Sequence, residues 1–131
     1  MTAKRFRALV AVCAALLLGS YAVQAVAEPS NKWRIVFDSR SDADGEIVLR
    51  IAPEGGTPID VTTKIPKGTS ENQAAQLLRK SLKATLDKKA YNVDVDDFEA
   101  VLLKKKGKTP KFDVTLASST VTGLTINFKR E

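Results

Sequence analysis

The chain has 131 residues, the length of one domain, with 44% apolar and 27% charged residues and a net charge of +6. It contains no histidine, which excludes Ser-His and Cys-His nucleophile pairs, an imidazole general base and histidine-ligated zinc. Its one cysteine is Cys13, so no disulfide forms within the chain. We therefore expect stabilisation by the hydrophobic core, and nothing in the sequence implies a cofactor.

The first segment of the chain has the order of a secretory signal peptide. Lys4, Arg5 and Arg7 form a positive start, and an uncharged, mostly aliphatic run over 8–18 is followed by small residues. The three basic residues account for half of the net charge of the whole chain. The pattern predicts a Sec-type signal peptide over 1–27 and a bacterial protein that is periplasmic or secreted.

Two cleavage positions have small residues at the required spacing, after Ala27 and after Ala25, and we favour Ala27. The alternative is an uncleaved anchor, because residues 8–27 form an uncharged stretch long enough to span a bilayer. The aliphatic density fades after Leu18, which favours cleavage. We expect a single globular domain over 28–131, with no transmembrane segment after cleavage.

The domain is predicted to contain short strands around one helix. Alternating apolar residues predict strands over 32–38, 46–52 and 59–65, and the Asp44-Gly45 pair predicts a hairpin between the first two. Ser70 and Gln73 fit a capping box, and an apolar stripe predicts a helix from there to about Asp87.

Four further strands are predicted after the helix, over 91–95, 98–104, 112–116 and 124–128. Seven strands and one helix predict an α+β fold, in which a mainly antiparallel sheet of about six to seven short strands packs on the helix. A β-sandwich with an inserted helix is the alternative.

Two acidic segments are candidate sites. Asp42-Ala43-Asp44-Gly45 resembles the middle of a calcium loop, but Arg40 and Ile51 occupy the positions of essential ligands, so we predict a turn and no metal site. Carboxylates at positions 94, 96, 97 and 99 could serve a small carboxylate-dependent hydrolase. We favour a solvated turn, because only one Trp and two Tyr are present to line a sugar cleft.

Basic residues are predicted to gather at one end of the fold. With antiparallel turns, the loop over 105–110 lies at the same end as the helix C-terminus and the last residues of the chain. This lysine-rich end would contain Lys88, Lys89, Lys104, Lys105, Lys106, Lys108, Lys111, Lys129 and Arg130. It is a candidate for binding a partner or polyanion, and the alternative is that the lysines only keep the turn hydrated and the strand edges unpaired.

Trp33 is a candidate partner anchor, although its phase with Ile35 and Phe37 favours a place in the core. We expect a non-catalytic binding or interaction module of the bacterial envelope, such as an inhibitor, assembly subunit or accessory factor. The expected partner is a protein of the envelope. Anionic lipid or lipopolysaccharide is the alternative, and nucleic acid is disfavoured because no aromatic platform accompanies the lysines. Asp94, Asp96 and Asp97 are predicted at the opposite end, and this separation of charge would also allow a salt-sensitive homo-oligomer.

Overall fold

A computed structural model describes residues 28–131, so the predicted signal peptide, its cleavage positions and Cys13 lie outside the described residues. The elements follow the predicted order closely, with seven strands and one helix in the described part. They are β1 (Lys32–Ser39), β2 (Gly45–Pro53), β3 (Ile59–Ile65), α2 (Glu71–Thr85), β4 (Tyr91–Asp96), β5 (Ala100–Lys105), β6 (Phe112–Ser119) and β7 (Leu124–Arg130).

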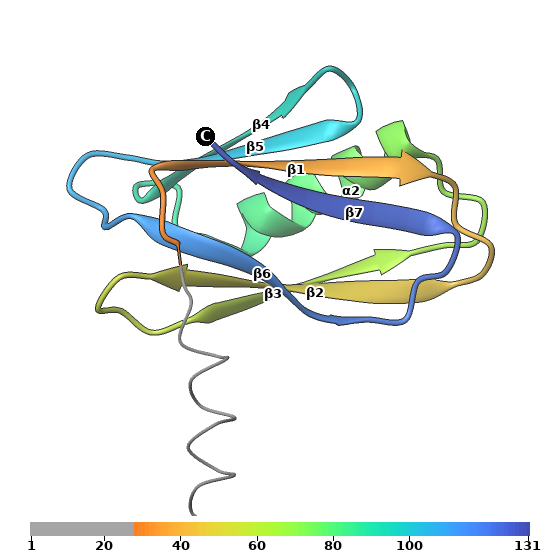
Figure 1. The fold of residues 1–131 in the computed structure, drawn as a ribbon, viewed down its shortest axis with the longest axis horizontal. Coiled ribbons are helices and arrows are strands. Elements are labelled where there is room, and N and C mark those ends of the chain that lie inside the picture. The colour runs from red at the N-terminus through yellow and green to blue at the C-terminus, as the bar shows by residue number, and fades with distance from the viewer. Residues whose placement is uncertain (1–27) are drawn as a thin grey trace, which may run out of the picture.

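The seven strands form two antiparallel sheets, which corrects the predicted single sheet (Figure 1). One sheet has the order β4-β5-β1-β7 and the other has the order β3-β2-β6. The predicted α+β fold is therefore wrong: the protein is a mostly β structure with one short helix. The predicted hairpin between β1 and β2 is also wrong, because β1 pairs with β5 and β7 while β2 pairs with β3 and β6.

The core lies between the two sheets and α2, which packs against β1, β3, β4 and β5. The inner faces carry the alternating apolar residues that the sequence indicated, and Ile35, Leu49 and Leu103 are fully buried. In α2, the buried side chains are Ala74, Ala75, Leu78 and Leu82.

The predicted capping box of α2 is confirmed. The Gln73 backbone N–H donates to the Ser70 hydroxyl, and the Gln73 side chain accepts from the Ser70 N–H. Both bonds satisfy donors that a helix start leaves free. No helix among residues 28–131 combines the length and the apolar character needed to cross a bilayer.

The turn between β4 and β5 differs from the sequence prediction. Phe98 was expected to begin a strand, but β5 begins at Ala100 and the Phe98 side chain is 76% exposed. Asp97 and Phe98 both have positive φ, and the Glu99 N–H donates to the Asp97 carbonyl at 2.8 Å. The strand therefore begins two residues later than the predicted range of 98–104, and its fully buried residues are Val101 and Leu103.

Candidate functional site

The lysine-rich end brings together three segments that are distant in the sequence. The loop after α2 meets the loop after β5, because the Lys106 N–H donates to the Ala90 carbonyl and its Nζ donates to the Lys88 carbonyl, both at 2.8 Å. Strand pairing places Lys104 beside Lys32 at the start of β1. Figure 1 shows the β5–β6 loop, the start of β1 and the C-terminus at the same side of the molecule.

The last two basic residues of the chain reach this end through β7. Strand β7 runs antiparallel to β1, with Lys129 opposite Arg34 and Arg130 opposite Trp33. Lys111 lies at the start of the neighbouring sheet, where its carbonyl accepts a hydrogen bond from the Glu54 N–H at 2.9 Å. All nine predicted basic residues are thus placed at one end, although β5, β6 and β7 are not successive neighbours in one sheet.

The charges of this end are poorly compensated within the described part of the chain. Among residues 28–131, none of its eight lysines lies within 4.0 Å of a carboxylate oxygen, and Arg130 pairs with Glu28 at 3.0 Å. Glu131, the residue after Arg130, pairs with Lys32 and Arg34. The lysine-rich end therefore presents a positive surface that an external anion can approach.

A hollow of about 430 Å³ opens beside the lysine-rich end, between the end of α2 and the edge of β4. Lys83, Lys88 and Lys106 surround it, and Leu86 and Tyr91 form part of its apolar lining. Burial raises the pKa of the Tyr91 phenol. The hollow thus combines an apolar lining with cationic side chains.

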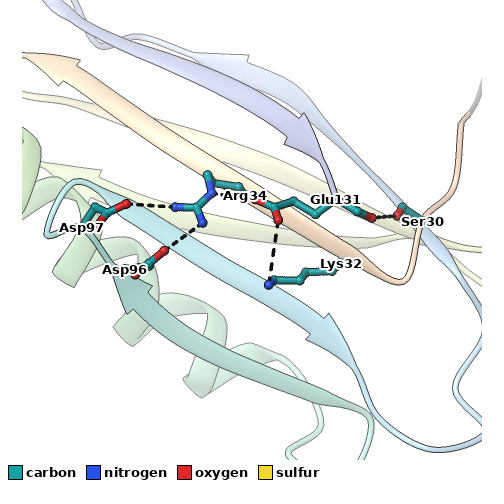
Figure 2. A network of polar contacts seen from close by, with 6 residues as sticks. All are labelled: Ser30, Lys32, Arg34, Asp96, Asp97 and Glu131. Carbon is teal, nitrogen blue, oxygen red and sulfur yellow. Dashed lines mark hydrogen bonds and ion pairs between the residues drawn. The ribbon is translucent and has the colours of Figure 1, made fainter.

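Two residues of the acidic cluster, Asp96 and Asp97, belong to an ion-pair network on the outer face of the four-stranded sheet (Figure 2). Arg34 reaches Asp96 at 2.8 Å, Asp97 at 3.6 Å and Glu131 at 2.7 Å. The Ser30 hydroxyl donates to the Glu131 backbone carbonyl at 2.7 Å. The network ties β1, the β4–β5 turn and the C-terminus together.

The hydrolase alternative would draw on the same carboxylates. Asp96 and Asp97 are engaged by Arg34, and Asp94 accepts a hydrogen bond from the Asn92 side chain at 2.9 Å. The geometry thus gives most of this cluster a structural role. Within residues 28–131, no group of three or more acidic residues has the arrangement of a metal site.

The Arg34 network predicts a pH-dependent contribution to stability. The guanidinium of Arg34 donates a hydrogen bond to Glu131 and thereby lowers the pKa of that carboxyl from its ordinary value of 4.5. A carboxyl whose pKa is lowered by folding stabilises the fold at pH values above its ordinary pKa. This contribution is lost as the pH falls through the lowered pKa. We expect Arg34→Gln to reduce the free energy of unfolding at pH 6 and to cost less near pH 3, as measured by urea denaturation.

Lys64→Gln is the matched control for Arg34→Gln. Lys64 is exposed and forms no ion pair within the described residues, so its substitution should have a small effect that changes little between the two pH values. An Arg34→Gln cost that is the same at pH 6 and near pH 3 would contradict the role assigned to the network.

The structure has a second cationic surface, which the sequence did not predict. A groove of about 910 Å³ runs along α2 and the loop before it, and its basic lining residues are Lys67, Arg79, Lys80 and Lys83. No acidic residue lines this groove. The spacing of positions 79, 80 and 83 on a predicted helix could have indicated a shared basic face, but the contribution of the preceding loop depends on tertiary structure.

Trp33 belongs to the core, as its alternation with Ile35 and Phe37 indicated. Its side chain is 7% exposed, and its indole N–H donates to the Phe112 carbonyl at 2.7 Å. Little of this ring lies at the surface, which favours a place in the core over a role as a partner anchor.

Comparison with models of known protein families gave no match, and neither did comparison with characterised protein sequences.

Proposed function

We propose that this protein is an exported, non-catalytic interaction module of the bacterial envelope, periplasmic or secreted, that acts by surface contact. An inhibitor, an assembly subunit and an accessory factor all act in this way. The signal-peptide pattern of residues 1–27 supports export. The gathering of eight lysines without carboxylate partners at one end of the described domain supports an anionic partner.

The partner that we favour is a protein with an acidic surface. A cationic surface speeds encounter with such a partner and selects against basic ones. The lysines lie on two loops and two strand ends, so they present a broad surface. Each exposed ion pair contributes only about 0.2–1 kcal/mol, so binding would depend on several lysines acting together.

The test is binding of the mature domain to envelope proteins by cross-linking and mass spectrometry. The domain is purified from the periplasm, where its intact mass should lack residues 1–27 or 1–25. We expect the triple substitution of Lys104, Lys106 and Lys108 by Gln to reduce specific cross-linking by about ten-fold or more, because three uncompensated charges are removed from one contact surface.

The control is the triple substitution of Lys64, Lys67 and Lys80 by Gln, which removes the same charge from exposed sites elsewhere. It should leave cross-linking within about two-fold of the wild type and should show the same weakening by salt. Loss of cross-linking in this control, with retention in the first variant, would place the contact at the groove beside α2 and contradict the proposal.

The hollow beside the lysine-rich end favours a second candidate, an amphiphilic anion such as an anionic lipid or lipopolysaccharide. Lys83, Lys88 and Lys106 would meet phosphate groups, and the apolar lining would receive part of a chain. Co-sedimentation with vesicles containing anionic phospholipid, but not with purely zwitterionic vesicles, is the expected result. Equal sedimentation of the wild type and Lys83→Gln/Lys106→Gln would exclude this candidate.

A further inference from the structure

Strand β7 has one edge without a neighbouring strand. It is the last strand in the order β4-β5-β1-β7, and within the described residues it pairs with β1 alone. That pairing has no irregularity in register, and β7 contains no proline. Two common features that prevent strand addition at a sheet edge are therefore missing from this strand.

The other open edge on this side of the molecule is less suited to pairing. Strand β6 has a shift in register at Val48 and Leu49 of its partner β2, and its first residue, Phe112, is already bridged to Ser30. A bulge and an occupied end both disfavour addition of a further strand. Of these two edges, β7 is the better suited to pairing.

The hydrogen-bonding groups that face away from β1 can be assigned. The Glu131 N–H donates to the Lys32 carbonyl at 3.0 Å, so residue 131 points its backbone groups toward β1. Because these groups alternate along an antiparallel strand, residues 129, 127 and 125 do the same. The N–H and carbonyl groups of Leu124, Ile126, Phe128 and Arg130 therefore face outward from the edge.

We propose that β7 pairs antiparallel with β7 of a second copy of this chain, joining two four-stranded sheets into one. The strand spans Leu124–Arg130, so full overlap places Asn127 opposite Asn127 of the second copy. Ile126 then faces Phe128 of the second copy, and both residues have outward backbone groups. This contact lies beyond the proposed partner binding and does not depend on it.

The side chains of β7 support this occupant. Leu124, Ile126 and Phe128 lie on the inner face but are only half-buried, so a second β7 would cover apolar surface that the single copy leaves accessible. Ile126 beside Phe128 of the second copy is an aromatic and β-branched cross-strand pair, a favourable type of contact.

Charge complementarity also favours a second copy in this register. Lys129 would lie opposite Thr125 of the second copy, and Thr125 is itself opposite Asp38 on β1. The backbones of Lys129 and of Asp38 in the second copy are then two strand spacings apart, about 10 Å. Their side chains bring the charged groups closer together than this. Both residues are exposed and neither forms an ion pair within the described residues.

The register is tested by a cysteine trap in the mature chain, which has no other cysteine. In the proposed pairing, Asn127 meets its own copy at a non-hydrogen-bonded position with a Cα–Cα separation of about 4.5 Å, close enough for a disulfide. We expect Asn127→Cys to form a disulfide-linked dimer under mild oxidation. Thr62→Cys on the exposed edge of β3 should stay monomeric under the same conditions.

Charge substitutions at Thr125 provide a second test, by sedimentation equilibrium. Thr125→Lys would face Lys129 of the second copy and should weaken the dimer by about two- to thirty-fold, whereas Thr125→Glu should strengthen it. In the single copy, position 125 faces Asp38, so the effects on monomer stability have the opposite sign. Thr62→Lys and Thr62→Glu are the matched controls and should leave the dimerisation constant unchanged.

The wild-type dimer should weaken as salt is raised, because Lys129 and Asp38 are exposed and their attraction is screened. A protein that stays monomeric at all accessible concentrations would overturn the proposal. The proposal would also be overturned if neither Thr125 variant changed the dimerisation constant and Asn127→Cys formed no disulfide-linked dimer.

Discussion

Replacing Phe112 by Ala is expected to reduce the free energy of unfolding by about 3–5 kcal/mol. Phe112 is fully buried at the start of β6, and its ring meets Tyr91 edge-on with centroids 5.3 Å apart. Because Tyr91 belongs to β4 in the other sheet, this contact holds the two sheets together. The truncation would leave a cavity where both sheets meet the core.

Leu116→Ala is the control for Phe112→Ala. Leu116 lies on the same strand and the same face, opposite the buried Leu49, but its side chain is 39% exposed. Its truncation should cost less than about 1.5 kcal/mol, because part of its apolar surface already contacts water. Urea denaturation of both variants gives the comparison, and equal costs would contradict the placement of the core.

The second large effect is expected for Gly123→Ala, a loss of about 2–5 kcal/mol in the free energy of unfolding. Gly123 has φ of +84° in the segment that carries the chain from β6 to β7. An added Cβ would lie 2.5 Å from the Arg40 carbonyl oxygen and 2.6 Å from the Asp42 side chain. The backbone of the crossing would have to move, in addition to adopting a strained conformation.

Gly107→Ala separates these two causes. Gly107 also has positive φ, +50°, but a Cβ added there meets nothing within 4 Å. This variant should therefore show the conformational cost alone, about 1–2 kcal/mol. If thermal or urea unfolding gave the same loss for both glycines, the close approach at Gly123 would not be a determinant of the fold.

The sequence predicts the individual strands and the helix, but it does not predict which strands pair with one another. Alternation at Trp33, Ile35 and Phe37 predicts β1, and the Ser70 capping box predicts the start of α2, because both signals depend on neighbouring residues. The assignment of strands to sheets depends on contacts between distant segments. Asp44-Gly45 is a good hairpin sequence, yet the chain crosses there from one sheet to the other.

The candidate site likewise has features that the sequence predicts and features that it does not. The gathering of Lys88, Lys106 and Lys129 could be predicted from the directions of successive strands, because a strand keeps its direction whichever of the two sheets it belongs to. The pairing of Arg34 with Glu131 could not, because it joins residues 97 positions apart through the β1–β7 register. The groove beside α2 depends in the same way on where the preceding loop packs against the helix.

The central claim, that the protein acts through its lysine-rich end, is tested most directly by photo-cross-linking in living cells. A benzoylphenylalanine side chain is introduced at Lys108, in the loop after β5, or at Phe98, an exposed aromatic position at the opposite end. We predict a specific adduct with an envelope partner from position 108 and none from position 98. A partner adduct from position 98 alone would contradict the assignment of the contact surface.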